Sequence, residues 1–406
     1  MMLIRFLLYI GRRAAFGVAI CLCIAPANAQ GLPQVIRSHN SGPGQCGSGD
    51  PSYINTANET GGVPLFLQRD EAGKAMQLMF ESSRKGLSTV LWASARLTSS
   101  TRNFDVPVDS VTDKITFTFS VDNKGTALVL RQPNGHEAGA GAPGVTDTEL
   151  NCGRVIAVVK PRAGVWHAEI SGTGTFWLKA QAQTDIDFIK AEFVESGGRP
   201  GHEGLFPIQG QPIVGQRATL RVWVSAAQTR TAEVALISSE GNVLRSLHLE
   251  PLNADRKSLE LTGEVMLPTV PFRIALTGRD VEGVSYQRLN APLFHAESVK
   301  IVPKFTFDEI APGTTRSGDL EVRNFGPSGY FKISAVDARK LVRKVEPAEL
   351  FVAAHETGRA HIRLVAPAGT STDVGDDVVI VVASMSGTSS TNSAIVHLSV
   401  SGKADP

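Results

Sequence analysis

The chain has 406 residues, which is too many for one hydrophobic core and predicts two to four domains. Hydrophobic residues make up 42% of the chain and charged residues 19%, so the composition excludes wholesale disorder. The 40 Lys and Arg residues balance 39 Asp and Glu residues without a basic block, so we expect no nucleic-acid partner.

The first 29 residues have the pattern of a secretory signal peptide. Arg12 and Arg13 precede an apolar run over 14–25, which is followed by the small-residue cleavage site Ala27-Asn28-Ala29. We expect the mature chain to begin at Gln30 and to reach the periplasm or the outside of the cell. A membrane anchor is the alternative, but the apolar run is shorter than the roughly 20 residues of a spanning helix. We therefore predict no transmembrane segment in the mature chain.

Cleavage at this site leaves two cysteines. Cys21 and Cys23 would be removed with the signal peptide, and Cys46 and Cys152 would remain as one pair. Disulfides persist in the compartments that exported proteins reach, so we predict a Cys46–Cys152 bond. Two unrelated buried thiols are the alternative, because the sequence cannot show that the side chains lie within bonding distance.

The segment 30–95 predicts a small strand and helix unit. Gly61 to Leu67 has the composition of a turn and a short strand, and apolar residues then recur every three or four positions between Asp70 and Gly86, as in an amphipathic helix. This piece is too small to fold alone. We expect it to pack against the sandwich that follows it, or to pair with a separate chain.

Most of the remaining chain alternates apolar and polar residues in short segments separated by Gly, Pro, Asn and Asp, which is typical of half-buried strands. Residues 378–383 are instead continuously apolar and predict a strand that is covered on both faces. We therefore predict an all-β protein with short strands. The alternating apolar positions are Ile115, Phe117, Phe119 and Val121; Leu220, Val222 and Val224; Ala360, Ile362 and Leu364; and Val396, Leu398 and Val400.

Breaks in composition at 196–198 and around 298–303 divide this region into three parts. Each part has about 100 residues, the length of an immunoglobulin-like sandwich. We predict tandem immunoglobulin-like β-sandwiches after the small N-terminal unit. The predicted domains are the signal peptide at 1–29, the strand and helix unit at 30–95, a β-sandwich at 96–196, and immunoglobulin-like β-sandwiches at 197–298 and 299–406.

Several short segments resemble hemicentins. Residues 53–57 and 60–62, with the predicted helix after them, look like the closing strand and helix of a von Willebrand factor A domain of the hemicentin type. The resemblance spans roughly 46–290 and implies that 30–95 is the remnant of a truncated α/β A domain. Further segments are similar, in the same order, to the region after the A domain in hemicentins: Pro161–Trp166, Ile186–Phe188, Pro207–Gly210, Thr277–Asp280 and Tyr286–Arg288.

Hemicentins are extracellular matrix proteins, so the resemblance implies adhesion or scaffolding outside the cell rather than catalysis. The Asp-x-Ser-x-Ser loop that holds the metal in A domains does not occur in this sequence, which implies that no such metal is bound. The last sandwich resembles an Ig-like module that is common in bacterial surface proteins. That resemblance rests on 325–329, Pro347 and 366–369.

The sequence assigns no catalytic, cofactor-binding or metal-binding residue. Residues 42–47 match the glycine pattern of a dinucleotide-binding loop, but they lack the strand before it and the helix after it. His361 and His397 fall on the polar side of predicted strands. The aspartates of the 372–377 loop leave incidental calcium binding open. Trp92, Trp166, Trp177 and Trp223 predict core plugs, with a sugar-stacking platform as the alternative.

Two functions remain open at this point. The first is a secreted, non-catalytic modular protein that binds a protein or cell-surface ligand, by adhesion or protein–protein contact at the cell envelope. The alternative is a secreted hydrolase or a carbohydrate-binding accessory protein. A concave pocket with paired carboxylates, or with a nucleophile and its base, would favour the alternative, whereas flat sandwich faces would favour a binding protein.

Overall fold

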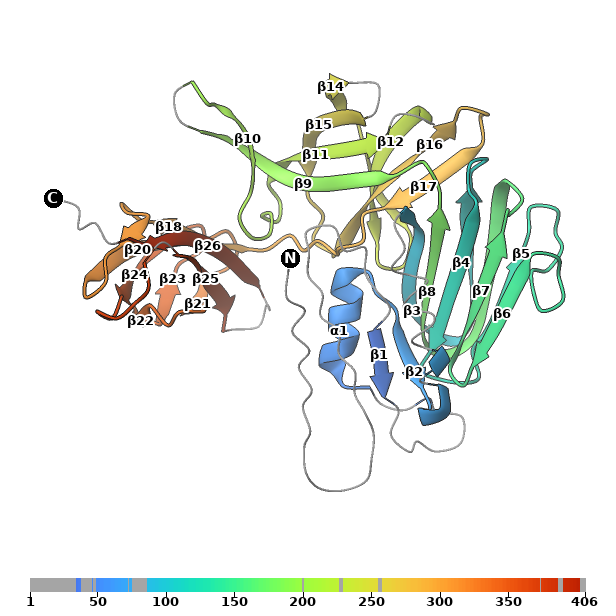
Figure 1. Ribbon diagram of the computed structural model, residues 1–406, viewed down its shortest axis with the longest axis horizontal. Helices are drawn as coiled ribbons and strands as arrows, with labels where there is room; N and C mark the ends of the chain where they lie inside the picture. Colours follow the sequence, from blue (N-terminus) through green and yellow to red (C-terminus); the bar gives the residue numbers. More distant parts are fainter. Residues whose placement is uncertain are drawn as a thin grey trace. The chain divides into compact units, whose positions relative to one another are not determined.

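Almost every described residue of the chain lies in a strand or in a turn between strands. The structure is a computed structural model, and its single described α-helix, α1 (Pro51–Thr60), has ten residues (Figure 1). The predicted all-β fold is confirmed. The residues that the structure describes are 34–37, 46, 49–71, 73–74, 86–198, 201–225, 229–254, 258–372, 374–385 and 390–401.

Contacts divide the chain into two units. The first comprises Met1–Glu192, Leu220–Gly263 and Pro271–Phe294, and the second comprises Phe193–Thr219, Glu264–Val270 and His295–Pro406. Two of the predicted domain boundaries, at 95/96 and 196/197, fall inside strands. The division into three sandwiches therefore stays a prediction.

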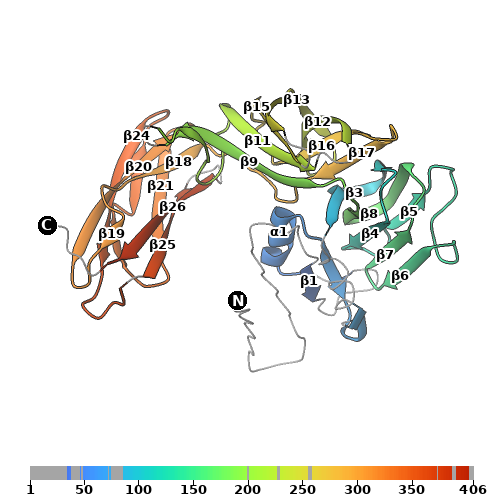
Figure 2. The same cartoon turned by 45° about the horizontal axis from the view of Figure 1, so that its top comes forward.

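The first unit is built around a ten-stranded sheet, coloured cyan to orange in Figure 2. Its strand order is β13-β12-β16-β17-β3-β8-β4-β7-β6, and β5 also pairs with β8. The strands are β3 (Leu87–Val108), β4 (Lys114–Val121), β5 (Ala127–Arg131), β6 (Val145–Leu150), β7 (Gly153–Val159), β8 (Gly164–Gln183), β12 (Thr229–Ser238), β13 (Val243–Leu247), β16 (Phe272–Asp280) and β17 (Ser285–Leu289).

Two of these strands are far longer than predicted. β3 has 22 residues and β8 has 20, and they pair antiparallel along their full length. Their register shifts between Thr98 and Ser100, where Ser99 has a φ of 55° and Gly172 of the opposing strand a φ of 135°. A Cβ atom at Gly172 would collide with the backbone of Gly125, so only glycine fits there. This bulge bends the long pair of strands β3 and β8.

The bend lets the paired strands β3 and β8 contribute to both layers of a sandwich. The half of β8 after the bulge pairs with β4, and the half before it pairs with β5. The Trp166 ring of the first half stacks on Phe117 of β4, with ring centroids 5.8 Å apart. The two halves therefore face each other across the core. The predicted apolar positions of β4, Ile115, Phe117, Phe119 and Val121, are all buried in that core.

The N-terminal strand and helix segment packs on this sandwich. It contains a parallel pair formed by β1 (Gln34–Arg37) and β2 (Pro64–Leu67), together with α1. β2 confirms the predicted short strand, and all four of its residues are buried. The indole Nε1 of Trp92 donates to Gly62 O at 2.9 Å, and that of Trp177 donates to Asn58 Oδ1 at 2.9 Å. The expected packing against the first sandwich is therefore present.

α1 lies where the resemblance implies a strand, and Gly73 and Lys74, inside the helix predicted between Asp70 and Gly86, are helical. Residues 53–57, which resemble a closing strand, lie in α1. Asp50 caps this helix by accepting from Ser52 N at 2.9 Å, Pro51 begins it, and Gly61 ends it with a φ of 73°. Most of the helix predicted between Asp70 and Gly86 lies outside the described residues, of which Arg69–Glu71 form a 3₁₀ turn.

A five-stranded sheet follows, in the order β10-β9-β11-β15-β14. The chain passes from one unit to the other within β9, β11 and β15. The predicted apolar positions Leu220, Val222 and Val224 of β11 are fully buried. The strands are β9 (Phe188–Gly197), β10 (Gly204–Pro207), β11 (Arg217–Ser225), β14 (Glu250–Ala254) and β15 (Ser258–Met266).

The C-terminal part of the second unit is a two-layer sandwich. One sheet has the order β18-β20-β24-β22, the other has the order β19-β26-β25-β21-β23, and a single apolar core lies between them. Ala360, Ile362 and Leu364 are buried in this core as predicted. The strands are β18 (Val299–Lys304), β19 (Glu309–Ile310), β20 (Thr315–Asn324), β21 (Gly329–Val336), β22 (Val342–Glu346), β23 (Glu349–Val352), β24 (Thr357–Val365), β25 (Val374–Ser384) and β26 (Thr391–Val400).

Candidate functional site

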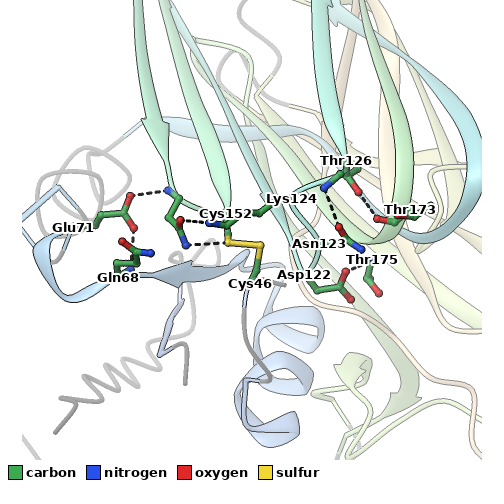
Figure 3. The surroundings of a disulfide bond; sticks show 12 residues. Cys46, Gln68, Glu71, Asp122, Asn123, Lys124, Thr126, Cys152, Thr173 and Thr175 are labelled. Atoms are coloured by element: carbon green, nitrogen blue, oxygen red, sulfur yellow. Dashed lines mark hydrogen bonds between the residues drawn. A yellow bond between two sulfur atoms is a disulfide. The ribbon is translucent and has the colours of Figure 1, made fainter. Parts of the chain in front are cut away.

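A disulfide joins the two cysteines that the predicted mature chain retains. Cys46 and Cys152 are both buried, and their Cα atoms lie 5.7 Å apart. Figure 3 shows the disulfide between Cys46 and Cys152, with Glu71 beside it. Asn151 Nδ2 donates to Cys152 Sγ at 3.3 Å, and Asn151 N donates to Glu71 Oε1 at 2.7 Å. Cys46 N donates to Asp122 O at 3.1 Å. The disulfide thus fastens the N-terminal strand and helix segment to the turn between β6 and β7.

Residues of the hemicentin-like segments meet in a buried polar network inside the first unit. Arg288 is fully buried and forms an ion pair with Asp109, whose side chain is also fully buried. Arg288 also donates to Ile186 O at 2.8 Å and to Thr184 Oγ1 at 3.1 Å. The guanidinium therefore ties β17 to the loop after β3 and to the loop after β8. We name this group, with Asp280 and Tyr286, the buried junction.

Asp280 and Tyr286 complete the buried junction. Asp280 accepts from the backbone N and the hydroxyl of Ser110, at 2.8 and 2.7 Å, while Tyr286 donates to Thr231 O at 2.8 Å. Burial alone would raise the pKa of Asp280, but these and further backbone hydrogen bonds outweigh it and lower that pKa. A Cβ atom at Gly278 would collide with Thr231 O, which explains this glycine. The segments Ile186–Phe188, Thr277–Asp280 and Tyr286–Arg288 thus connect strands inside the first unit.

A second buried polar group lies between the sheet and α1. Lys179 is directly opposite Trp92, and the Arg273 guanidinium lies 3.7 Å from the centroid of the Trp92 ring. Arg273 donates to Asn58 O of α1 and, at 3.0 Å, to Ala291 O. Burial, together with the charge of Arg273, lowers the pKa of Lys179 to about 7. Both side chains are enclosed by protein and meet interior groups.

The four tryptophans divide into two kinds. Trp92, Trp166 and Trp177 are buried, which confirms that they are core plugs. Trp223 is half-buried, and both Arg221 and Lys190 lie over its ring, at 4.5 and 5.2 Å from the centroid. Cations therefore already pack against the one tryptophan that reaches the surface.

Three histidines have carboxylate partners that the sequence did not reveal. Nδ1 of His361 lies 2.7 Å from Asp319 Oδ1, and Nδ1 of His397 lies 2.5 Å from Asp377 Oδ1. His167 is paired with an aspartate on β3 in the same way. Each partner is the residue directly opposite on the neighbouring strand. More than half of every side chain in these pairs is exposed, so bulk water surrounds them and weakens their electrostatic effects.

The remaining site candidates give no assembled centre. Asp376, from the acidic segment 372–377 that was predicted to be a loop, lies in β25, is nearly buried and accepts from Arg339 N at 3.1 Å, whereas Asp373 lies outside the described residues. In the part of the chain that the structure describes, no three His, Cys, Asp or Glu residues are grouped so that they could hold a metal ion. Of the glycine-rich segment 42–47, only Cys46 is described. No described helix is long and apolar enough to span a membrane.

The apolar run of β25 is covered on one face only. Val378, Ile380 and Val382 are fully buried in the core of the C-terminal sandwich, whereas residues 379, 381 and 383 on the other face are half-buried. The prediction that this strand is covered on both faces is therefore wrong. The sequence placed apolar side chains on both faces of the strand, and one set of them lies on the outside of the sandwich.

Exposed apolar side chains extend this surface on both sides. Tyr330 and Phe351 are opposite each other on β21 and β23, are 57% and 56% exposed, and have ring centroids 5.4 Å apart. Met385 is 51% exposed, and its backbone N donates to Tyr330 O at 2.8 Å. We name this surface the outer apolar face. Its apolar residues are Tyr330, Val336, Phe351, Val379, Val381, Ala383, Met385 and Ile395, and Lys332 and Ser334 lie between Tyr330 and Val336 on the same face of β21.

Comparisons with known proteins show similarity to von Willebrand factor A domain-containing protein 7 and to hemicentin-1 at low sequence identity. Residues 302–402 match the family described as the VWA7 Ig-like domain. Rat von Willebrand factor A domain-containing protein 7 is 27% identical over 248 residues, which cover 57% of this chain and 27% of the rat protein. Mouse hemicentin-1 is 22% identical over 259 residues, which cover 63% of this chain and 4% of hemicentin-1. The chain thus spans about a quarter or less of these relatives.

Among solved structures, the three-domain ectodomain of mouse nectin-like molecule 4 is similar at 11% identity, with 72% of this chain and 95% of that chain covered and a TM-score of 0.17.

Proposed function

We propose that this protein is an exported, non-catalytic binding or scaffold protein that contacts a protein partner at the cell envelope through the outer apolar face. The observation that carries the proposal is β25, whose apolar run continues on a face that the sandwich core does not use. Tyr330, Phe351 and Met385 extend that face with large exposed side chains.

Physical chemistry supports a protein partner for such a face. Contiguous exposed apolar side chains on a globular protein mark interaction sites, because leaving them in water costs free energy. Tyrosine, phenylalanine and methionine are enriched at the centres of protein interfaces. The face also lies within the residues that match the VWA7 Ig-like domain.

The first unit fits the role of a scaffold. Three of the hemicentin-like segments, Ile186–Phe188, Thr277–Asp280 and Tyr286–Arg288, hold strands together in the buried junction, and the disulfide fastens the N-terminal strand and helix segment to the sandwich. The disulfide is consistent with export to an oxidising compartment, as the signal-like N-terminus also suggests. The resemblance to hemicentins points in the same direction, towards adhesion or scaffolding outside the cell.

Capture of partners tests the proposal. The full mature chain, immobilised, is exposed to the envelope fraction and the medium of its own cells, and bound proteins are identified by mass spectrometry. We expect specific proteins on the natural chain and their loss from a Tyr330→Ser, Phe351→Ser variant. Val243→Ser is the matched control, because Val243 is 62% exposed in the first unit. Equal capture by the natural chain and the double variant would contradict the proposal.

A further inference from the structure

Strand β23 is the last strand of its sheet and bears one of the two aromatic side chains of the outer apolar face. It pairs antiparallel with β21, with Lys332 opposite Glu349 and Tyr330 opposite Phe351. Because β23 has a neighbouring strand on one side only, some of its backbone N–H and C=O groups can hydrogen-bond to another strand on the other side.

The hydrogen-bond pattern between β21 and β23 identifies these groups. Ile333 N donates to Ala348 O at 2.7 Å, so these two residues form a hydrogen-bonded pair. Such pairs alternate with non-hydrogen-bonded pairs along an antiparallel ladder. The pairs Lys332–Glu349 and Tyr330–Phe351 are therefore of the second type. Consequently, the backbone N–H and C=O groups of Glu349 and Phe351 point away from β21, towards the open edge.

A contact on the other side of β21 confirms this assignment. Met385 N donates to Tyr330 O at 2.8 Å, so the backbone of Tyr330 is directed towards β25 and not towards β23. Non-hydrogen-bonded pairs also bring opposite side chains closer together, in accord with the ring contact between Tyr330 and Phe351. Each group that β23 directs to the open edge is a donor or acceptor for another strand.

The side chains at this edge define the chemistry of a matching strand. Glu349 and Phe351 are both exposed and, two residues apart, lie on the same face. A strand added at the edge would place one residue opposite each of them. Beside Phe351 and Tyr330 an aromatic or aliphatic side chain fits. Opposite Glu349 a lysine or arginine fits, since opposite charges in that position stabilise a sheet and like charges destabilise it.

Charge also argues against a second copy of β23 as the added strand. The strand sequence is Glu-Leu-Phe-Val, so no register between two copies places a basic residue of β23 opposite Glu349. An acidic residue on an edge strand opposes self-association of this kind. The complementary segment must therefore come from another sequence.

We propose that β23 is a strand-addition site. An extended segment of a partner protein pairs with Glu349 and Phe351 through its backbone, with an apolar residue opposite Phe351 and a lysine or arginine opposite Glu349. In this type of recognition, main-chain hydrogen bonds give affinity, and alternate side chains give specificity. The inference rests on the proposed function, because it assigns the partner segment that meets one edge of the outer apolar face.

Synthetic peptides test this site directly. The probes are fluorescent, blocked peptides Thr-Thr-Phe-Thr-Lys-Thr-Thr and its reverse Thr-Thr-Lys-Thr-Phe-Thr-Thr, which cover antiparallel and parallel addition. Their binding to the full mature chain is measured by fluorescence anisotropy. We expect one of the two to bind, and replacement of its lysine by glutamate to weaken binding by about tenfold or more. N-methylation of the amides that face β23 should abolish binding, because it removes the backbone donors; these are the Phe and Lys amides in antiparallel addition and the amides of the threonines that follow Lys and Phe in parallel addition.

Variants of the chain distinguish binding at β23 from nonspecific binding of the peptides elsewhere on the protein. Glu349→Lys should reverse the preference, so that the glutamate peptide binds better than the lysine peptide. Glu346→Lys is the matched control, because it makes the same charge change on β22 of the other sheet and should leave the preference intact. Equal binding of lysine and glutamate peptides, binding that survives N-methylation, or no binding up to about 1 mM would overturn the inference.

The failure of this inference differs from failure of the proposed function. If the peptides fail but the Tyr330→Ser, Phe351→Ser variant still loses captured proteins, the outer apolar face binds its partner without strand addition. If capture is also insensitive to that variant, the proposed function is wrong as well.

Discussion

The two sandwiches described most fully, one in each unit, differ in the cations that they bury and in the aromatic side chains that they expose. The first unit buries an ion pair, Arg288–Asp109, and two further cations, Lys179 and Arg273, among its apolar residues. The C-terminal sandwich has an apolar core and leaves other apolar side chains, Tyr330 and Phe351 among them, in contact with water.

This difference indicates different tasks. Buried polar groups need partners with defined geometry, and in the first unit those partners come from separate segments of the chain, which become fixed to one another. Exposed apolar groups add little to the stability of the sandwich that carries them, but they release water when a partner covers them. Under the proposed function, the first unit supplies cohesion and the C-terminal sandwich supplies the contact surface.

The disulfide should give the largest effect on stability. The bond closes a loop with a sequence separation of 106 residues, so on the chain-entropy model its loss costs about 4–5 kcal/mol. We expect a Cys46→Ser, Cys152→Ser variant to lose this much free energy of unfolding in urea titrations. Mass spectrometry of the non-reduced chain should show the two cysteine peptides linked. Two freely alkylated thiols would refute the bond.

Breaking the buried junction should cost nearly as much. Arg288→Met leaves the Asp109 carboxylate buried without its cation, and loss of one member of a buried ion pair costs about 3–5 kcal/mol. Hydrogen exchange should become faster in β3, β8 and β17 and stay unchanged in β20 and β24. Arg102→Met is the matched control, since its ion pair with Glu240 is exposed. A loss below about 1 kcal/mol for Arg288→Met would argue against the junction.

The buried lysine should make stability depend on pH. The pKa of Lys179 is about 7 in the folded chain and near 10.4 in the unfolded chain, so between these values the unfolded chain binds more protons. Stability should therefore rise with pH in this window, by on the order of 1–4 kcal/mol between pH 7 and 9.5. Lys179→Met should remove this rise, whereas the exposed Lys332→Met should keep it. Identical slopes in all three proteins would contradict the assignment.

The outer apolar face should matter least for stability. Tyr330→Ser and Phe351→Ser remove side chains that are more than half exposed, so each should change the free energy of unfolding by less than about 1 kcal/mol. Phe331→Ser, next to Tyr330 but buried in the core, should cost several times more. Equal losses at 330 and 331 would show that the face belongs to the core.

The sequence predicted the strand interiors well because alternation is a local property. Phe117, Val222 and Ile362 were placed in cores from their neighbours alone, and all three are buried. The helix α1 was missed because it has almost no apolar stripe and only Ala57 is buried. The available signals were its caps, Asp50-Pro51 at the start and Gly61 at the end.

Long-range partners could not be predicted. Arg288 meets Asp109 across 179 positions of sequence, and His361 meets Asp319 across 42. Such pairs depend on strand register, which one sequence does not reveal. The apolar run at 378–383 was detected, but whether its second face is covered depends on which other elements lie over it. That information resides in the tertiary fold, and it is what locates the outer apolar face.

Photo-crosslinking in living cells tests the central claim most directly. A photoreactive phenylalanine analogue is placed at Phe351, in the outer apolar face, and in separate chains at Val243 and at Arg359, on the outside of the opposite sheet. We expect a discrete crosslinked protein species from position 351 and none of that mass from the other two positions. The same species from all three positions, or none from position 351, would contradict the claim that this face binds a protein partner.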